Sequence, residues 1–346
     1  MIVGAGDVAS RLVRRRQQAW KAVCAKMPHD GQRPPGRRAA LRWLSLARSR
    51  QSADTQRLAG MLPVMGDLDV AASLARIRRL ARSAAAVLVL APPPAQGLDD
   101  PRLRRMLAVP PARCRRRRAG GRATRSTRRA RPLACVYVST TGVYGDCLGE
   151  RIDETRRLQP TTDRARRRVA AEAHWRQSAR RGRLLGRTTG GSRAVILRAP
   201  GIYALDRLPL DRLRARTPVL RREEDVFTNH IHADDLADAV WRSMFHGRPL
   251  RVYNVVDEAE WTMAEYFDRV ADAFGLPRPP RMSRHELVHH ISPMLLSFMN
   301  ESRRIGNRRL LRELGVRLRY PTPAALLSAT THAATTSPAP VQGALW

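Results

Sequence analysis

The stretch Met1–Ala9 (MIVGAGDVA) decides the fold. It joins a short apolar run to the pattern Gly-x-Gly-x-x-Ala, in which Gly4 and Gly6 precede a potential helix. Glycines at such a turn let the backbone approach a pyrophosphate, and the N-terminus of the helix attracts its negative charge. The stretch therefore predicts a strand, a turn and a helix, with Gly4, Gly6, Asp7 and Val8 beside a dinucleotide.

Further apolar runs of strand length follow along the chain, and helical segments alternate with them. Strands are expected at 43–47, 61–65, 85–90, 134–138 and 194–198, and a helix at 164–181. This alternation predicts an α/β fold, with a doubly wound, parallel, Rossmann-like sheet that helices cover on both faces. Such sheets bind their ligands at the carboxyl ends of the strands, where the motifs of this chain also lie.

The end of the second expected strand predicts which dinucleotide is bound. A fold that selects NAD places an acidic residue there for the ribose 2′-hydroxyl, but this chain has Arg48. A basic residue favours the 2′-phosphate of NADP, so NADP is the expected cofactor, with NAD as the alternative. The distance from Gly6 to Arg48 is about twice the usual spacing of roughly 20 residues. We therefore expect the segment 14–42 to be an irregular, Arg-rich insertion.

The charge of the chain raises the question of nucleic-acid binding. The formal net charge is +34, and of the 64 basic residues only Lys21 and Lys26 are lysines. So pure an excess of arginine is more typical of a GC-rich coding bias than of a selected phosphate-binding surface. A second Arg-rich irregular segment at 113–131 has no interleaved aromatic residues on which bases could stack. An Arg-rich nucleic-acid-associated protein is thus an alternative that we do not favour.

Cysteine usage and hydropathy indicate the cellular setting. The four cysteines are scattered without a Cys-x-x-Cys pair, which favours neither a disulfide framework nor a zinc site. No apolar run reaches the roughly 18 residues of a membrane span, and no secretory signal is visible. We expect a cytoplasmic protein without a membrane partner. The tail at 326–346 is rich in Ala, Thr, Ser and Pro and is expected to be disordered.

Several motifs resemble those of the extended short-chain dehydrogenase/reductase family, also called NAD-dependent epimerases/dehydratases. They are Val138–Gly145 (VSTTGVYG), Asn229–Ala237 (NHIHADDLA), Val252–Val256 (VYNVV) with the following Thr262–Glu265 (TMAE), and the turn Gly66–Leu68 (GDL). The resemblance runs from Leu44 to about Pro321 and leaves out the two Arg-rich segments. It implies oxidoreductase or epimerase chemistry on a sugar-nucleotide-like or small carbonyl substrate.

The resemblance also implies a domain organisation and a set of site residues. A Rossmann-like domain is expected at 1–257, and a small, mostly helical substrate-side lobe at 258–325. Members of the family pair through the helix at 164–181, but here its positive charge opposes self-association, so monomer and homodimer both stay open. The further cofactor-binding residues lie at strand ends and on that helix, and are Asp67, Leu68, Ala91, Pro92, Ser139, Arg168, Pro200, Gly201 and Ile202.

The catalytic pair of the family is missing. Its Tyr-x-x-x-Lys motif falls on Arg164 and Arg168, so the cation is kept and the tyrosine is lost. A guanidinium, with a pKa above about 12, does not act as the proton donor. Thr140 aligns with the catalytic hydroxyl and is assigned, with Tyr144 and Arg168, to the catalytic set. Tyr144, Tyr203 and His232 are the candidates for a relocated acid.

Three functions follow from these departures. The chain is a reductase or epimerase with a relocated acid, an NADP-binding sensor or partner-binding module without turnover, or a decayed gene product. No metal is assigned to His230, His232, Asp234 and Asp235, because the resemblance makes the aspartates a helix cap. Arg303 or Arg304 is a candidate ligand for a substrate phosphate.

Overall fold

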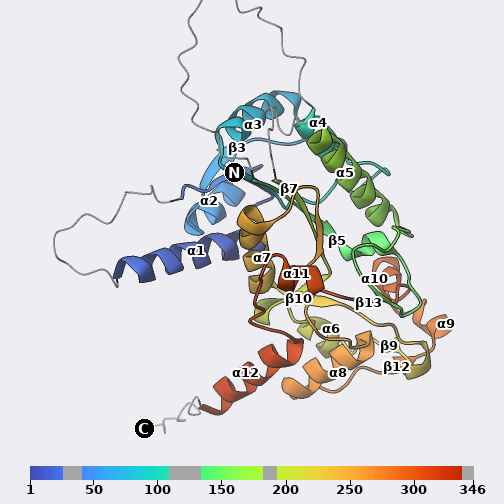
Figure 1. The fold of residues 1–346 in the computed structure, drawn as a ribbon. Helices are drawn as coiled ribbons and strands as arrows, with labels where there is room; N and C mark the ends of the chain where they lie inside the picture. Colours follow the sequence, from blue (N-terminus) through green and yellow to red (C-terminus); the bar gives the residue numbers. More distant parts are fainter. Residues whose placement is uncertain (26–40, 109–133, 182–192, 337–346) are drawn as a thin grey trace, which may run out of the picture.

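A seven-stranded parallel sheet forms the centre of the computed structural model, which describes residues 1–25, 41–108, 134–181 and 193–336 (Figure 1). The strands, in spatial order, are β11 (Val252–Asn254), β7 (Arg193–Ala199), β5 (Ala134–Thr140), β4 (Ala86–Val89), β1 (Ile2–Val3), β2 (Leu44–Ala47) and β3 (Leu62–Met65). All neighbouring strands are parallel, and the chain order reverses between β1 and β4. This topology confirms the predicted doubly wound fold.

The sheet is buried on both faces because its central strands are apolar throughout. In β5, Val136 packs into one core, while Cys135 and Tyr137 pack into the other. Successive side chains of a strand point to opposite faces, so each strand contributes to both layers. One core also contains residues of α1 (Asp7–Ala25) and α7 (Ala233–His246). The other contains residues of α3 (Ala71–Ser83), α4 (Pro101–Leu107) and α5 (Asp163–Arg180).

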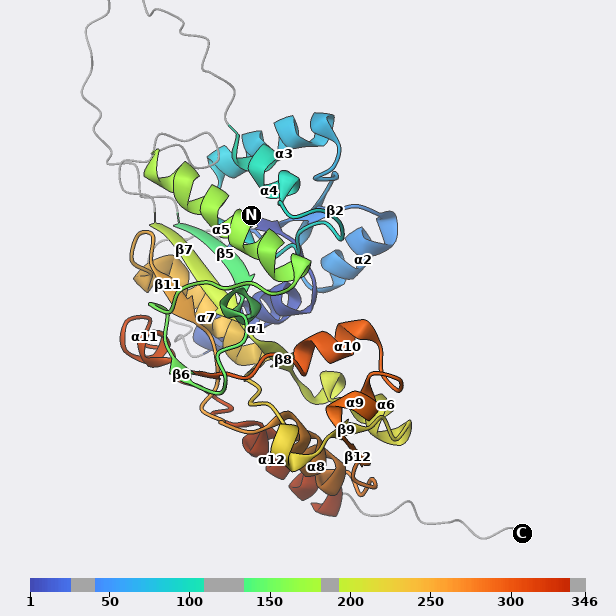
Figure 2. The same cartoon turned by 90° about the vertical axis from the view of Figure 1, so that its right-hand side faces the viewer.

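A smaller lobe lies beyond the carboxyl edge of the sheet (Figure 2). Its core joins Leu213 and Val219 to Phe267 and Leu327. Its elements are α6 (Leu210–Arg214), β9 (Val219–Leu220), α8 (Met263–Ala273), β12 (Arg281–Met282), α9 (Arg284–Leu287), α10 (Pro293–Phe298) and α12 (Pro323–Thr336). The lobe therefore contains segments from before and after residue 257, where the sequence predicted the boundary between the two domains.

Shorter elements connect the lobe to the sheet. Two pairs of short parallel strands form beside it, and α11 packs against β11, so the segment after α10 returns to the main sheet. The connecting elements are β6 (Arg151–Ile152), β8 (Gly201–Tyr203), β10 (His230–His232), β13 (Arg304–Ile305), α11 (Arg308–Arg312) and the 3-10 turns η1 (Thr141–Tyr144), η3 (Leu205–Arg207) and η4 (Arg222–Glu224). The remaining helix, α2 (Arg50–Leu58), packs beside β2 and β3 of the main sheet.

Two expectations about irregular segments were wrong where the structure describes them. The first half of the supposed insertion at 14–42 continues α1 as far as Ala25. The supposed disordered tail at 326–346 is helical as far as Thr336, and Leu326 and Leu327 are buried. Residues 26–40 and 337–346, and the Arg-rich segment 113–131, lie outside the described residues.

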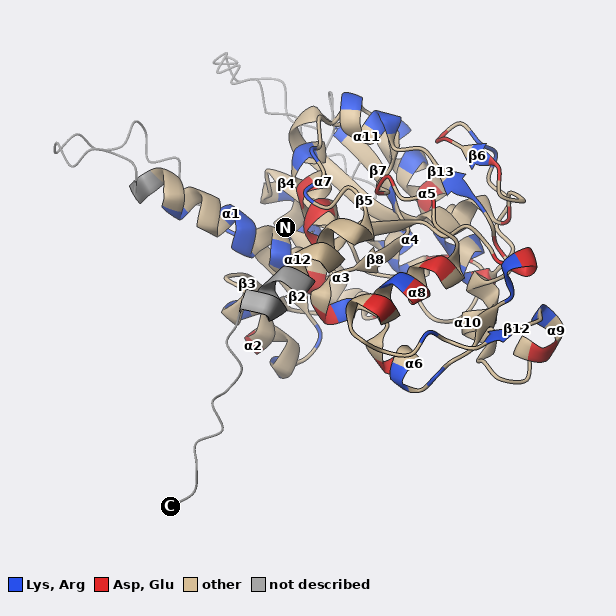
Figure 3. Ribbon diagram, turned by 90° about the horizontal axis from the view of Figure 1, so that it is seen from below, with Lys and Arg blue, Asp and Glu red and all other residues tan. Residues whose placement is uncertain are grey.

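Basic residues lie along α1 and acidic residues along α7 (Figure 3), and the arginines of α1 form ion pairs with α7. Arg15 donates to Asp234 at 3.3 Å and also pairs with Asp238, which is bound by Arg16 as well. These residues lie where α1 packs on α7. Residues 11 and 15 are four apart and share one face of the helix, and Arg11 also pairs with Asp234, so an apparently featureless basic run becomes an ion-paired helix contact. Over the residues that the structure describes, no helix has the length and apolar character that a membrane crossing requires.

Candidate functional site

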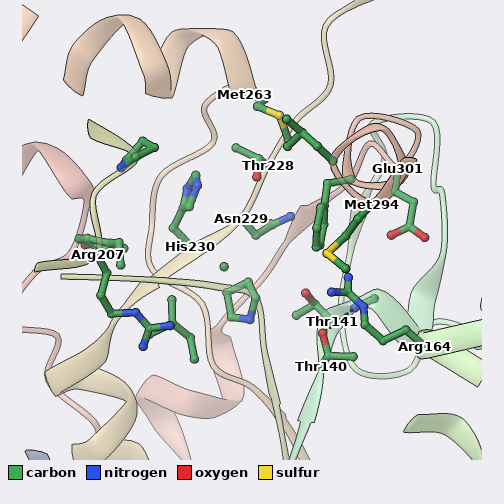
Figure 4. A pocket seen from close by; sticks show the side chains of 18 of the residues that line it. Thr140, Thr141, Arg164, Arg207, Thr228, Asn229, His230, Met263, Met294 and Glu301 are labelled. Atoms are coloured by element: carbon green, nitrogen blue, oxygen red, sulfur yellow. Dashed lines mark hydrogen bonds between the residues drawn. The ribbon is translucent and has the colours of Figure 1, made fainter. Parts of the chain in front are cut away.

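A cavity of about 990 Å³ lies between the carboxyl edge of the sheet and the small lobe (Figure 4). The sheet side contributes residues at or just after the carboxyl ends of β4, β5 and β7, and these are Pro92, Thr140, Thr141, Pro200, Gly201 and Ile202. The lobe side contributes the charged residues Asp211 and Arg212 of α6, but most of it is apolar and consists of Met263, Tyr266, Phe267, Met294, Leu295 and Phe298. This is the place where a doubly wound sheet binds its ligand.

The turn between β1 and α1 has the geometry of a phosphate cradle. Gly4 has a φ of 90°, and a Cβ there would lie 2.2 Å from the backbone nitrogen of Ala91, so only glycine fits. A Cβ on Gly6 would meet no atom of the described residues within 4 Å. The N-terminus of α1 thus opens onto free space that suits a pyrophosphate. Of the four residues predicted here, Asp7 is also the partner of Arg11 and Arg207.

The next two strands bring the predicted ribose and adenine residues to one edge. Arg48 is exposed directly after β2, and Ser49 caps α2. Asp67 and Leu68 follow β3, where the Asp67 carboxylate accepts from the Asp69 amide at 2.9 Å. Arg102 binds Asp69 and, with Arg105 and Arg48 nearby, holds the pKa of that carboxyl below its usual range. Sequence reasoning missed the ion pair of Arg102 with Asp69, because the two residues lie on different elements.

Thr140, the predicted catalytic hydroxyl, closes β5 at the wall of the cavity. Its Oγ1 accepts from the Gly142 amide at 3.3 Å and caps η1. Ser139, predicted to contact the cofactor, is buried, and its Oγ has no partner among the described residues. Thr140 lies at the cavity and Ser139 is buried because neighbouring residues of a strand face opposite sides of the sheet.

The two arginines at the positions of the missing pair both line the cavity. Arg168 Nη1 donates to the Tyr137 hydroxyl and to the Val138 carbonyl, both at 3.0 Å. The guanidinium of Arg164 lies 4.4 Å from the centre of the Phe298 ring. Burial lowers the pKa of Arg164, but a guanidinium remains protonated at neutral pH.

Tyr144 does not reach the cavity, and its geometry argues against a role as relocated acid. It is fully buried, donates to Asn254 Oδ1 at 2.7 Å and accepts from Arg198 Nη1 at 2.9 Å. Arg198 in turn pairs with the buried Glu172 of α5 at 2.7 Å. Tyr144 therefore belongs to a buried polar network that ties η1 to α5, and burial raises its pKa.

The other two candidates for the acid differ in position. His232 Nδ1 accepts from the Asp234 amide at 3.1 Å, so the histidine itself caps α7. The expectation that both aspartates form this cap was wrong, since Asp235 accepts from the backbone of Arg319 and Tyr320, each at 2.9 Å. Tyr203 lines the cavity, and burial raises its pKa.

Sequence reasoning missed His230 as a cavity residue. Its ring stacks on Tyr266 at 4.2 Å, and its Nδ1 has no partner in the described part of the chain. Burial lowers the pKa of His230 to about 4, so the ring is neutral at neutral pH. The alternation of His230 and His232 was a visible signal. Both side chains point to the same side of β10, and the sequence does not tell which of them lies nearer to the cavity along the strand.

Of the two arginines predicted for a substrate phosphate, only Arg303 lines the cavity. Its Nη1 donates to the Gly145 carbonyl at 2.6 Å and to Glu301 at 2.7 Å. Arg304 donates to the Gly149 carbonyl at 2.8 Å and packs on the Phe227 ring. Glu301, which sequence reasoning did not single out, is the acid nearest to this part of the cavity and also accepts from Thr161 at 2.6 Å.

Solved structures share this fold over nearly the whole chain, whereas no family model and no curated protein matches it. A conserved protein of unknown function from Silicibacter pomeroyi is 26% identical, with a TM-score of 0.68 over 97% of this chain and 98% of that one. The dTDP-glucose 4,6-dehydratase of Bacillus anthracis, solved with NAD, is 14% identical, with a TM-score of 0.65 over 97% of this chain and 96% of its own.

A second dTDP-glucose 4,6-dehydratase, from Streptomyces venezuelae and also solved with NAD, is 18% identical. Its TM-score is 0.63 over 96% of this chain and 95% of its own. With the strand order and the motifs already described, these similarities confirm the resemblance drawn from the sequence. The chain has the fold of the extended short-chain dehydrogenases/reductases, the family of the NAD-dependent epimerases/dehydratases.

Proposed function

We propose that this protein is an NAD(P)-binding oxidoreductase or epimerase-like enzyme with a non-standard acid/base group. It acts on a sugar-nucleotide-like or small carbonyl substrate in the cavity beside Thr140. One observation carries the proposal: the free space at Gly6 before α1 lies at the same edge of the sheet as the cavity. A dinucleotide that starts at this turn reaches the cavity by following that edge. The dehydratases of the same fold were solved with NAD.

The residues at this edge divide into cofactor and substrate groups. Gly4, Gly6 and the N-terminus of α1 hold the pyrophosphate, and Arg48 holds a 2′-phosphate, which favours NADP over NAD. Arg168 binds the nicotinamide ribose, and the Thr140 hydroxyl orients a substrate oxygen. When bound, the nicotinamide supplies the hydride chemistry. Arg164 stabilises negative charge on the substrate but does not transfer a proton.

Titration with NADPH and NADH, followed by nicotinamide fluorescence at near-physiological salt, tests the proposal. Gly6→Val is the sharpest variant, because its side chain enters space that is empty without the cofactor and leaves the fold intact. We expect it to abolish binding of both dinucleotides while the circular dichroism spectrum is unchanged.

Arg48→Glu tests the cofactor preference separately. We expect it to weaken NADPH binding by at least about tenfold and NADH binding much less, since one charge-assisted phosphate contact is lost. Arg57→Glu, an exposed change at the far end of α2, the helix that follows Arg48, is the control and leaves both affinities unchanged. If the wild-type protein binds neither dinucleotide, both the enzyme and the sensor functions are excluded.

A non-catalytic NADP-binding sensor or partner-binding module is the second candidate. It is favoured by Arg164 in place of the tyrosine and by the engagement of the Tyr144 hydroxyl in a buried network. Absorbance at 340 nm, with NADPH and a panel of aldehydes, ketones and keto acids, separates the sensor from a reductase. Consumption of NADPH supports the enzyme. NADPH that binds but is not consumed supports the sensor or an epimerase, which returns the hydride to its substrate, and conversion of a sugar nucleotide detected by NMR then separates these two.

A further inference from the structure

We propose that the part of the cavity at the start of α5 is an oxyanion site, in which Arg164 and Arg303 bind a carboxylate or phosphate group of the substrate. This assignment names a chemical class for the substrate and so rests on the proposed function. It starts from an imbalance of charge. Arg164, Arg167 and Arg168 of α5 and Arg303 all line the cavity, and Glu301 is the acid beside them.

Among the described residues, Arg164, Arg167 and Arg168 form no salt bridge, although Glu301 lies near Arg164 and Asp100 near Arg168. In the part of the chain that the structure describes, none of them has a carboxylate oxygen within 4.0 Å, whereas Arg166, on the outer side of the same turn, pairs with Asp163 at 2.8 Å. Arg167 donates to the Gly97 carbonyl and Arg168 to neutral oxygens of β5. Arg167 is buried and Arg168 half-buried, and positive charge at such positions is costly unless an anion offsets it.

Arg164 is the member that remains available. Among the described residues it makes no hydrogen bond, and its contact is the stacking on Phe298. Figure 4 shows its guanidinium beside Thr140, Thr141 and Met294. A planar guanidinium that stacks by its face keeps its edge for a bidentate contact with an oxyanion.

Two further features support an anion at this place. Arg164 lies in the first turn of α5, where the helix dipole disfavours a cation and favours an anion. Arg303 is held by Glu301 and Gly145, and its buried Nε has no partner among the described residues. An oxyanion between Arg164 and Arg303 lies beside Thr140, which holds the reacting oxygen in the proposed function.

Isothermal titration calorimetry at constant ionic strength tests the site without any cofactor. The probes are pyruvate, its neutral analogue pyruvamide, and inorganic phosphate. We expect pyruvate or phosphate to bind and pyruvamide not to bind. Arg164→Gln weakens binding of the anion by at least about tenfold, as loss of a charge-assisted pair predicts, and Arg164→Lys weakens it less. Arg166→Gln is the matched control on the same helix and leaves the affinity unchanged.

A stability measurement separates this role from a structural one. Arg164 makes no hydrogen bond among the described residues and opposes the helix dipole, so Arg164→Gln without anions unfolds at the same or a higher temperature than the wild type. Equal binding of anions by the wild type and Arg164→Gln overturns the assignment, as does binding of pyruvamide as tight as that of pyruvate. If pyruvate binds and phosphate does not, the site takes a carboxylate group of the substrate. If phosphate binds and pyruvate does not, it takes a phosphate group. NADPH titration of the same variants reports on the proposed function independently.

Discussion

Asp257 shows how strongly one buried residue beside the site depends on its surroundings. It is 4% exposed, and its Oδ1 accepts from the Ala259 amide at 3.1 Å. Burial, with Asp235 nearby, raises its pKa from 3.8 to about 8. The folded state therefore keeps a proton that the unfolded chain releases near pH 4. Between about pH 4 and 8, this group makes the free energy of unfolding fall as pH rises.

The variant Asp257→Asn tests this dependence. Burial lowers the pKa of His230 and of His232 to about 4, so these rings destabilise the fold as pH falls below about 6.5 and contribute little above it. From pH 6.5 to 8 we expect the free energy of unfolding of the wild type to fall by on the order of 1 kcal/mol per pH unit because of Asp257, and that of the variant to fall much less. Urea denaturation across this range measures the difference. Parallel curves for the two proteins would contradict the raised pKa.

Single residues also show what the sequence could predict about the site. The turn at Gly4 and Gly6 was predictable, since its geometry depends on neighbouring residues of the chain. Tyr144 was not, because the path of η1 decides whether its hydroxyl faces the cavity or the buried Asn254. The contact of Arg164 with Phe298 joins α5 to α10, and no local pattern signals a contact over that separation.

At the scale of elements, the packing of α1 on α7 replaces part of an apolar contact by ion pairs. Arg15, Arg16 and Asp238 have side chains that are 16%, 22% and 21% exposed. Pairs at such half-buried positions contribute more than surface pairs, and removal of the acid leaves two cations facing each other. The prediction of an irregular segment at 14–42 was wrong for residues 14–25, which belong to α1. The proline and arginine content of the segment obscured the helical spacing of the residues that face α7.

The variant Asp238→Asn tests this contact between elements. We expect a loss of roughly 1–2 kcal/mol in the free energy of unfolding, because Arg15 and Arg16 lose their shared partner. Asp54→Asn is the matched control. It removes an exposed pair with Arg57 on α2, and we expect a change of less than about 0.5 kcal/mol. Urea denaturation of both variants measures the two values, and equal losses would contradict a special role for the α1–α7 contact.

At the scale of the whole molecule, the net charge of +34 dominates interactions with polyanions. Many described arginines are already paired with acids in the fold, on α1, α5, α8 and near the C-terminal lobe. The overall fold class was predictable because the alternation of strands and helices is a property of long segments. The composition of the small lobe was not, since its segments are distant in the chain and meet only through packing.

Fluorescence anisotropy with two unrelated DNA duplexes of about 20 base pairs tests the nucleic-acid alternative. We expect binding near 20 mM salt that falls steeply and is lost near about 150 mM, as counterion release predicts for any strongly basic protein. The two duplexes should bind alike. Preference for one of them that persists at physiological salt would favour a nucleic-acid function over the proposed one.

The repeated passage of the chain between the sheet and the small lobe limits how the protein can be dissected. After β8 the chain enters the lobe, returns in β10 and α7, leaves again for α8, comes back in α11 and ends in α12. No single cut in the polypeptide separates the two parts. A fragment that ends near residue 257 takes α6 and β9 away from α8 and exposes the apolar faces of both, so the protein should be expressed and engineered only as an undivided unit.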